Sequence, residues 1–297
     1  MTTVRKTLAQ AAAELTSAGI DGARLDAEVL LAHALRTSRS GLLMRLRDPL
    51  DGDVAAEFST LVQRRLRREP VAYSVGGREF WSLWFETTPA TLIPRPETEL
   101  VVAAALGRIS RTNSPRVLDV GTGSGCIAVA IAHERTDAAL TAIDVSAGAL
   151  AVARRNASAH AVCERIQFRC EDFRTLAEGE SYDLIVSNPP YVRSGDLESL
   201  PPDVGRFEPS LALDGGEDGL LFVRSLCARA PRLLAPKGAL VLEVGSDQGE
   251  SAISLARAAG FGEATVRDDY AGLPRVLIAG ACAASTGRGV EEGCVTP

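Results

Sequence analysis

The sequence predicts an α/β protein in which a small helical domain precedes a doubly wound, mostly parallel sheet. Three observations predict this fold. Before residue 75, apolar residues recur every three or four positions, which indicates amphipathic helices. From Arg116 onward, short β-rich runs alternate with helical stretches, as in a parallel sheet covered by helices. A glycine-rich turn at residues 121–125 follows the first of these runs, where such sheets bind ligands.

Four segments follow from these patterns. Residues 1–75 are expected to form the helical module. Residues 76–96 are rich in aromatic side chains and are expected to form a β-hairpin and linker, with the aromatics sealing the contact between two domains. Residues 97–280 form the sheet domain. Residues 281–297 are mostly small and polar, and we expect a disordered tail there.

Within the sheet domain, strands and helices are expected to alternate. The strand candidates are residues 117–120, 140–143, 166–168, 184–186, 239–244 and 276–278. The segments with helical spacing between them are residues 125–134, 146–159, 217–234 and 246–260. Such alternation is typical of a sheet whose strands lie parallel and whose helices cover both faces.

Length and composition exclude several classes of protein. The 297 residues are 46% hydrophobic and 24% charged, so the chain is long enough for two cores and is not expected to be disordered as a whole. No apolar run reaches the roughly 18 residues that a spanning helix needs, and residues 2–6 lack the apolar stretch of a signal peptide. We therefore expect no membrane partner and a cytoplasmic location.

Cysteine, histidine and lysine usage narrows the chemistry further. The six cysteines form no C-x-x-C pair, and none of the three histidines has a second ligand at metal spacing, so we expect no disulfide framework and no metal. No G-x-S-x-G elbow of a serine hydrolase is present. The two lysines, Lys6 and Lys237, do not follow a G-x-x-x-x-G loop, which excludes a phosphate-binding P-loop.

Charge is distributed unevenly along the chain. The formal net charge is -6, and the acidic surplus lies after residue 90. Domains that bind nucleic acid usually carry a basic surplus, so direct nucleic-acid binding is not expected. The basic strip at residues 64–68 is interpreted as a solvated helix face, with contact to an acidic partner as the alternative.

The glycine-rich turn predicts a nucleotide-like cofactor. It reads G-x-G-x-G, and its glycines let the backbone approach a ligand closely. A dinucleotide site would need a third glycine or alanine where Cys126 stands. The tighter form resembles the first motif of the class I S-adenosylmethionine-dependent methyltransferases, in which the loop passes under the methionine portion. With NAD as the alternative, the cofactor-binding residues predicted here are Gly121, Thr122, Gly123, Ser124 and Gly125.

Two further strand ends are expected to contact the cofactor. Asp144 ends the second strand, where a carboxylate can accept both ribose hydroxyls of either cofactor. Asp172 and Phe173 follow the third strand. In this class of methyltransferase such a pair would accept a hydrogen bond from the adenine amino group and stack on its ring. The alternative for Asp172 is a helix N-cap.

The tetrapeptide Asn188-Pro189-Pro190-Tyr191 directly follows the fourth strand, where open α/β sheets bind ligands. Two successive prolines fix the backbone and remove two N–H donors. They leave the Asn188 side-chain oxygen and the Pro189 carbonyl as acceptors, which suit an NH₂ group. Tyr191 offers an aromatic face for a planar amide or base. We predict that all four residues are catalytic and bind the substrate, and that Asn188 also contacts the cofactor; a plain strand-to-loop turn is the alternative.

Further segments accompany the tetrapeptide, namely residues 92–99 (LIPRPETE), 206–209 (RFEP), 242–245 (LEVG) and 269–270 (DY). Together they resemble the HemK/PrmC family over roughly residues 5–280. The resemblance implies the class I methyltransferase fold, with S-adenosyl-L-methionine as methyl donor and S-adenosyl-L-homocysteine as product. It also implies methylation of the side-chain amide nitrogen of the Gly-Gly-Gln glutamine in class I peptide chain release factors. Phe173 stands where some members have tryptophan.

For an amide acceptor we expect positioning by Asn188 and Pro189 to carry the catalysis, without a dedicated general base. Arg95 and Glu97 are expected to close over the site, or else to form a surface salt bridge. The helical module is expected to contact the partner protein, and the chain to act as a monomer. A nucleic-acid amino-methyltransferase (adenine N6 or guanine N2) and a non-catalytic NAD-binding protein are the competing functions.

Overall fold

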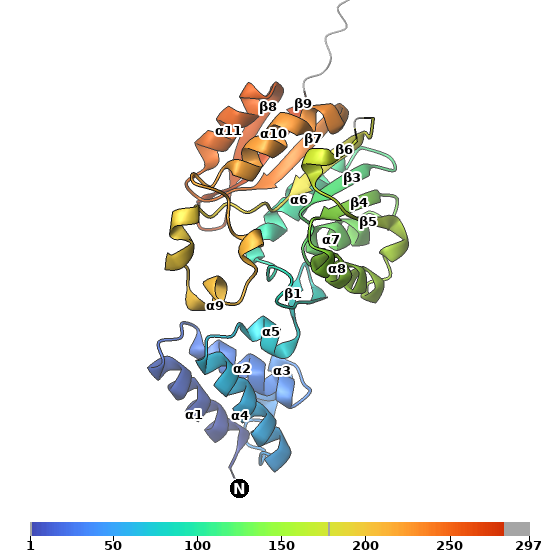
Figure 1. Cartoon of the computed structure of the whole chain (residues 1–297). Helices are drawn as coiled ribbons and strands as arrows, with labels where there is room; N and C mark the ends of the chain where they lie inside the picture. The colour runs from blue at the N-terminus through green and yellow to red at the C-terminus, as the bar shows by residue number, and fades with distance from the viewer. Residues whose placement is uncertain (1, 178, 282–297) are drawn as a thin grey trace, which may run out of the picture.

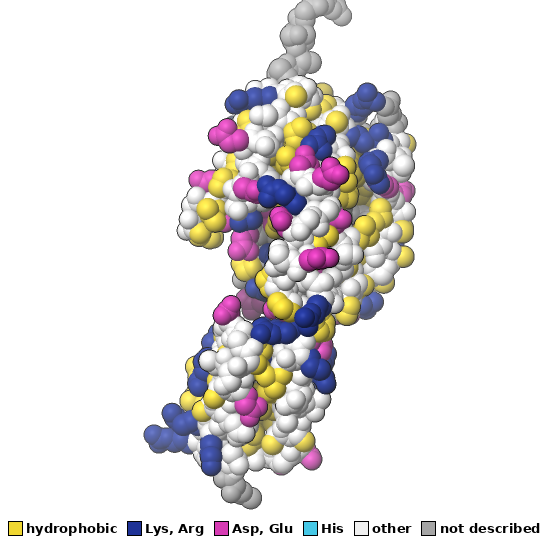
Figure 2. All heavy atoms as spheres, turned by 60° about the vertical axis from the view of Figure 1, so that its left-hand side comes forward, with side chains coloured by type: hydrophobic (Ala, Val, Ile, Leu, Met, Phe, Trp, Pro, Cys, Tyr) yellow, Lys and Arg dark blue, Asp and Glu magenta, His cyan; other side chains and the backbone are white. Residues whose placement is uncertain are grey.

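Two lobes make up the structure, a computed structural model that describes residues 2–177 and 179–281. The N-terminal lobe is helical and lies below the sheet lobe in Figure 1. Figure 2 shows that the two lobes meet at a narrow waist. Of the expected tail, Ala281 ends the last described strand, and residues 282–297 lie outside the described residues.

The N-terminal lobe has a core of its own. Its helices are α1 (Val4–Ser17), α2 (Ala23–Ala34), α3 (Arg39–Met44), α4 (Gly52–Leu66) and α5 (Val71–Val75). Side chains of Thr3, Ser38 and Asp51 cap α1, α3 and α4 by accepting backbone N–H bonds, which satisfies donors that a helix start leaves free. Leu8 and Leu31 are buried in one apolar cluster, which contains only residues of this lobe among those described.

A β-hairpin connects the lobes. Strands β1 (Gly77–Phe80) and β2 (Leu83–Glu86) are antiparallel. Trp81 and Ser82 between them have φ of 53° and 58°, as a two-residue type I′ turn requires. Phe80 and Phe85 pack edge to face in the sheet core, whereas Trp84 is 54% exposed. The expected strand pair is present, but its aromatic residues do not all seal the contact between the lobes.

The described strands of the second lobe form one seven-stranded sheet in the order β5-β4-β3-β6-β7-β9-β8. Their bounds are β3 (Arg116–Val120), β4 (Ala139–Asp144), β5 (Ile166–Cys170), β6 (Tyr182–Ser187), β7 (Leu234–Glu243), β8 (Phe261–Asp268) and β9 (Pro274–Ala281). Neighbours from β5 to β7 are parallel, and β9 is antiparallel to both β7 and β8. The predicted doubly wound, mostly parallel sheet is confirmed.

Helices cover both faces of the sheet. One face packs on α6 (Glu99–Ile109), α7 (Cys126–Glu134) and α8 (Ala147–Ala159), and the other on α10 (Leu221–Leu233) and α11 (Gly249–Ala258). Along β3, Val117 belongs to the first cluster and Leu118 to the second, because successive side chains of a strand point to opposite faces. Shorter turns are α9 (Pro202–Gly205), η1 (Pro96–Thr98), η2 (Cys163–Arg165), η3 (Phe173–Thr175), η4 (Ser194–Ser199) and η5 (Ser210–Ala212).

The sequence analysis missed two elements and misplaced the bounds of others. Neither α6 nor β8 was expected. β8 lies at the sheet edge, where most of its side chains are partly or fully exposed, so its apolar pattern is weak. The strand expected at 239–244 begins earlier, at Leu234, and ends at Glu243. The helix expected at 217–234 begins at Leu221.

The strand order reverses between β3 and β6. From β3 the chain proceeds to β4 and β5 on one side, and from β6 to β7 on the other. Such a switch point leaves a crevice beyond the carboxyl ends of the strands. Val120, the last residue of β3, is in register with Ser187, the last residue of β6, so the glycine turn and the tetrapeptide start side by side.

The described residues contain neither a membrane-spanning helix nor a metal-binding cluster. None of their helices is both long and apolar enough to cross a bilayer. No group of three or more His, Cys, Asp or Glu side chains among them is arranged to hold a metal ion.

Candidate active site

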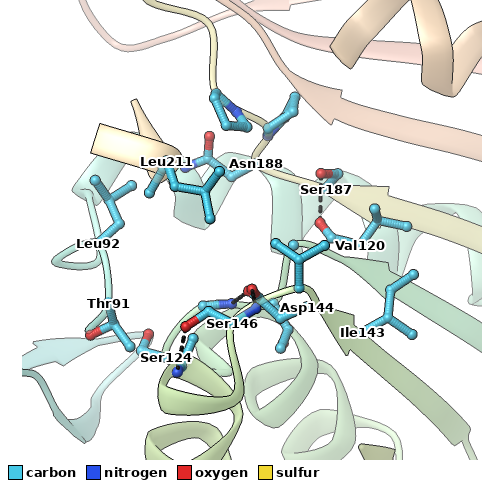
Figure 3. A pocket seen from close by; sticks show the side chains of 18 of the residues that line it. Thr91, Leu92, Val120, Ser124, Ile143, Asp144, Ser146, Ser187, Asn188 and Leu211 are labelled. Carbon is cyan, nitrogen blue, oxygen red and sulfur yellow. Dashed lines mark hydrogen bonds between the residues drawn. The ribbon is translucent and has the colours of Figure 1, made fainter. Parts of the chain in front are cut away.

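A cavity of about 230 Å³ opens at the switch point. The glycine turn, Asp144, Phe173 and the Asn188-Pro189-Pro190 corner all contribute to its wall. In Figure 3, Asp144 and Ser146 lie on one side of this cavity and Asn188 and Leu211 on the other. The Ser187 hydroxyl donates to the Val120 carbonyl at 2.7 Å, which holds the two strand ends together. The fold thus brings most of the predicted site residues to one cavity.

The glycine turn places backbone against this cavity. Gly121 has a φ of 66°, and a Cβ built on it would meet no atom within 4 Å, so its side faces open space. Gly125 has a φ of 81°, and a Cβ there would lie 3.0 Å from the Cβ of Ala153 on α8. Both need the left-handed conformation that glycine adopts readily. The first leaves room for a ligand, whereas the second lets α7 and α8 pack closely.

Asp144 joins the end of β4 to the glycine turn. Its Oδ2 accepts the Gly123 N–H at 2.9 Å, and its Oδ1 accepts the Ser146 N–H at 2.8 Å. A carboxylate has about four acceptor positions, so lone pairs remain for hydroxyl groups of a ligand. Asp144 is therefore held rigidly at the cavity wall and is still able to accept hydrogen bonds.

Asp172 and Phe173 are neighbours in the sequence but have different contacts in the structure. Phe173 is buried and lines the cavity, where its ring can stack on a planar group. Asp172 caps η3 by accepting the Arg174 N–H at 2.9 Å, and it also pairs with the Arg174 guanidinium. This pairing lowers the pKa of Asp172. Capping, the structural interpretation of Asp172, is thus seen, and its contact with adenine stays a prediction.

The Asn188 corner presents two acceptors. The Asn188 Nδ2 donates to the Thr98 Oγ1 at 3.0 Å. Among the described residues no donor is hydrogen-bonded to the Asn188 Oδ1 or to the Pro189 carbonyl. Both residues line the cavity together with Pro190. Two oxygen atoms that lack protein partners are what a ligand with two N–H bonds requires.

Tyr191 lies outside the residues that line the cavity. Its hydroxyl donates to the Glu243 Oε1 at 3.1 Å, and burial, followed by the charge of Glu243, raises the pKa of Tyr191. Its carbonyl accepts the Gln248 Nε2 at 3.0 Å. The structure thus ties Tyr191 into the wall behind the corner, and stacking of Tyr191 on a substrate stays a prediction.

The sequence analysis missed two polar residues behind the corner. Thr98 and Glu243 are 1% and 0% exposed, and the Thr98 hydroxyl donates to the Glu243 Oε2 at 2.6 Å. Both residues lie in segments that carried the family resemblance, 92–99 and 242–245, but they had no assigned role. The available signal was an acidic residue at the end of an otherwise apolar strand, which needs a partner when buried.

Asp119 is a third missed residue. It is fully buried on β3, and its Oδ2 accepts the Thr122 hydroxyl at 2.6 Å, while its Oδ1 has no hydrogen-bond partner among the described residues. Burial raises the pKa of Asp119 to about 7. Asp119 thus supports the glycine turn from below.

Arg95 does not pair with Glu97 as in the expected surface salt bridge. Its Nη2 donates to the Glu208 Oε1 at 2.5 Å, and the Glu208 Oε2 accepts the Ile93 N–H at 3.0 Å. The Glu208 side chain is 1% exposed, so this pair is largely buried. Arg95 lines the cavity, whereas Glu97 is exposed and does not.

The basic strip at 64–68 is largely engaged within the protein, which corrects its interpretation as a solvated face. Arg64 bonds Glu69, and Arg68 donates to the Gly19 carbonyl at 3.0 Å. Arg65 is buried and donates to Asp26 at 2.7 Å and, across the waist, to Asp203 at 3.4 Å. Arg67 is the exposed arginine of the strip.

Comparisons with known proteins agree with this geometry. Residues 6–76 match the PrmC N-terminal domain, and residues 101–200 match the methyltransferase small domain. A release factor glutamine methyltransferase of Moorella thermoacetica is 44% identical over 93% of this chain and 98% of its own length. Another, of Geobacter sulfurreducens, is 42% identical over 93% and 95%.

A solved methyltransferase structure from Pyrococcus furiosus has a TM-score of 0.52 at 18% identity and covers 73% of this chain and 98% of its own. At that identity the likeness concerns the fold. The sequence identities above 40% over nearly whole chains show the family as well as the fold. The chain belongs to the release factor glutamine methyltransferase family.

Proposed function

We propose that this protein transfers a methyl group from S-adenosyl-L-methionine to the side-chain amide nitrogen of a glutamine in class I peptide chain release factors, within their Gly-Gly-Gln motif. Family membership supports the reaction, and the relatives' name supports the substrate. The observation that carries the proposal is the pair of unpartnered acceptors, the Asn188 Oδ1 and the Pro189 carbonyl, at the wall of a cavity that the glycine turn also lines.

The residues of the cavity fit this cofactor. The open space beside Gly121 leaves room for the methionine portion. Asp144 keeps lone pairs for two ribose hydroxyls, and the Phe173 ring suits one side of an adenine. The remaining members of the proposed set are Thr122, Gly123, Ser124, Gly125, Asp172 and Asn188. When bound, S-adenosyl-L-methionine supplies a methyl group on a positively charged sulfur.

The residues at the corner would prepare the acceptor. A carboxamide nitrogen is a weak nucleophile because its lone pair is delocalised into the carbonyl. If the Asn188 Oδ1 and the Pro189 carbonyl accept its two N–H bonds, they orient the nitrogen toward the methyl group and exclude other geometries. Positioning of this kind can contribute about 7–11 kcal/mol to lowering a barrier, so no general base is assigned. The prolines contribute by fixing the backbone.

The helical lobe is proposed to recognise the partner protein. A second cavity of about 750 Å³ lies between the lobes, lined by Val29, Arg39, Trp84 and others. Arg95 and Glu208 line this cavity as well, and Arg95 also lines the cofactor cavity. A protein loop that reaches the corner would thus pass residues of both lobes. The proposal assigns recognition of the partner protein to residues 1–75. It also includes that the protein acts as a monomer and in the cytoplasm.

Methyl transfer to alternative acceptors tests the function. The enzyme would be incubated with tritiated S-adenosyl-L-methionine and a bacterial class I release factor, the same factor with its Gly-Gly-Gln glutamine replaced by alanine, DNA, or ribosomal RNA. We expect label in the unaltered release factor alone. Label in DNA or RNA instead would favour a nucleic-acid amino-methyltransferase. Calorimetry with S-adenosyl-L-homocysteine and with NAD would test the cofactor, and binding of NAD alone would contradict it.

A further inference from the structure

A chain of hydrogen bonds connects the Asn188 side chain to a buried carboxylate. The Asn188 Nδ2 donates to the Thr98 Oγ1 at 3.0 Å, and the Thr98 hydroxyl donates to the Glu243 Oε2 at 2.6 Å. The other carboxylate oxygen, Oε1, accepts the Tyr191 hydroxyl at 3.1 Å. Thr98 lies in η1, Asn188 follows β6 and Glu243 ends β7, so residues far apart in the sequence meet behind the corner.

The donors and acceptors in this chain fix its direction. An ionised carboxylate can only accept hydrogen bonds, and a threonine hydroxyl has one proton. Because Thr98 gives that proton to Glu243, its oxygen must accept from Asn188. The amide nitrogen of Asn188 is therefore the group that faces Thr98, and its oxygen is left for the cavity. With Glu243 replaced by a donor, the same contacts would favour the opposite amide orientation.

The hydrogen-bond partners of Glu243 favour an accepting carboxylate, against the effect of its burial. Burial raises the pKa of Glu243, and the hydrogen bonds from Thr98 and Tyr191 and the positive charge of Arg275 act in the opposite direction. The negative charge of Glu97 adds a smaller upward effect on this pKa. Both carboxylate oxygens have a hydroxyl donor at hydrogen-bond distance, so the buried charge is compensated on each side.

We propose that Thr98 and Glu243 are positioning residues that determine acceptor specificity: through Asn188 they present an oxygen to the methyl acceptor, so that the site takes a carboxamide and rejects a carboxylate. This inference rests on the proposed function and deepens it. A glutamine offers two N–H bonds to the Asn188 Oδ1 and the Pro189 carbonyl. A glutamate in the same place offers only oxygen atoms, which those acceptors repel. An Asn188 that is free to turn would present its NH₂ group and remove this discrimination.

The test compares Thr98→Val with Thr98→Ser. Valine keeps the shape of threonine without the hydroxyl, whereas serine keeps the hydroxyl. Each enzyme, saturated with S-adenosyl-L-homocysteine, is titrated with a full-length release factor and with its variant carrying glutamate in place of the Gly-Gly-Gln glutamine. We expect the unaltered enzyme and Thr98→Ser to prefer glutamine by about tenfold or more, and Thr98→Val to bind both factors within about threefold, since misdirecting a buried polar group is worth at least one hydrogen bond.

Rates give a second readout. Thr98→Val should lower kcat more than it raises KM for the release factor, because the docking surface is unchanged while the acceptor nitrogen is misoriented. Its affinity for S-adenosyl-L-homocysteine should match that of Thr98→Ser, whereas its thermal midpoint should be lower, because valine leaves the buried Glu243 carboxylate with one hydroxyl donor in place of two. If Thr98→Val does not fold, Thr98→Ala provides the same measurement, because it also removes the hydroxyl that accepts from Asn188.

The possible results distinguish failure of the positioning role from failure of the proposed function. Retained preference for glutamine in a folded Thr98→Val or Thr98→Ala enzyme overturns the positioning role while leaving the proposed function intact. Failure of the unaltered enzyme to methylate any release factor overturns the proposed function and this inference with it. Loss of preference in Thr98→Ser as well would also contradict the proposal, because the hydroxyl is then not what orients Asn188.

Discussion

At the scale of single residues, the most direct prediction concerns the Asn188 side chain. Replacing Asn188 with alanine removes one of the two free acceptors of the cavity wall. We expect kcat for release factor methylation to fall by an amount equivalent to about 2–4 kcal/mol of barrier, as for deletion of one oriented hydrogen-bonding group. The affinity for S-adenosyl-L-homocysteine should fall by much less, because Asn188 is one of several residues proposed to hold the cofactor. Asn113→Ala, an exposed asparagine outside the cavity, is the matched control. Near-normal turnover of Asn188→Ala would contradict the role of the corner.

Asp119 predicts a pH dependence of stability. Burial raises its pKa from 3.8 to about 7 in the folded protein, so the folded state binds this proton more tightly than the unfolded state. The resulting stabilisation is fully present below pH 3.8 and is lost as the pH rises through 7. Relative to Asp119→Asn, which does not titrate, the free energy of unfolding should fall by on the order of 4 kcal/mol over this range. Denaturant unfolding of both proteins at pH 4, 6 and 8 measures it, and parallel curves would show that Asp119 ionises normally.

At the scale of elements, the turn between β1 and β2 offers a substitution that tests backbone strain away from the cavity. Ser82 is exposed, has a φ of 58° and makes no side-chain hydrogen bond among the described residues. Because a non-glycine residue pays about 1–2 kcal/mol in this conformation, Ser82→Gly should raise the free energy of unfolding by about 0.5–1 kcal/mol after its larger backbone entropy is counted. Ser82→Ala should give no gain. Equal thermal midpoints for the two variants would mean that the turn is not strained.

Some elements could be predicted from the sequence, and others could not. The strands around the switch point were predictable because buried parallel strands read as short apolar runs between glycine or proline punctuation. Edge strand β8 was not, because exposed positions interrupt its apolar pattern. The glycine turn and Asn188 were found as local motifs. Thr98 and Glu243 could not be linked from sequence, since 145 residues separate them and their contact exists only after α6 and β7 pack beside β6.

Ion pairs were the feature that the sequence predicted least well. Arg95 has Glu97 two residues away, but the chain turns into η1 at Pro96, and the partner of Arg95 is the distant Glu208. The strip at 64–68 looks like a charged surface in the sequence, yet Arg65 is buried between Asp26 and Asp203. Charge runs carry no information on burial, because neighbouring residues of a helix and of the turn after it point in different directions, and any of them can point inward.

For the whole molecule, the separation of cores predicts how a truncated protein behaves. Most buried apolar residues of the N-terminal lobe cluster among themselves, and the sheet lobe has two clusters of its own, whereas Ala72 and Tyr73 form a small cluster with Ile93 and Phe207. We therefore expect a protein lacking residues 1–75 to fold and to bind S-adenosyl-L-homocysteine, but to lose most methylation of full-length release factor. Calorimetry and methyl-transfer assays on the truncated and full-length proteins provide the measurement. Undiminished methylation would refute a recognition role for the helical lobe.

The place of β9 has a consequence for synthesis of the protein. This strand, the last of those that the structure describes, is inserted between β7 and β8, which are made before it. Until residue 281 has left the ribosome, the β7 edge has no neighbour, and an unpaired apolar edge is prone to pair with other chains. The glycine turn and the Asn188 corner are complete long before then. A nascent chain can thus hold the glycine turn and the corner while the other half of the sheet waits for β9, and termination before residue 274 would leave the β7 edge unpaired.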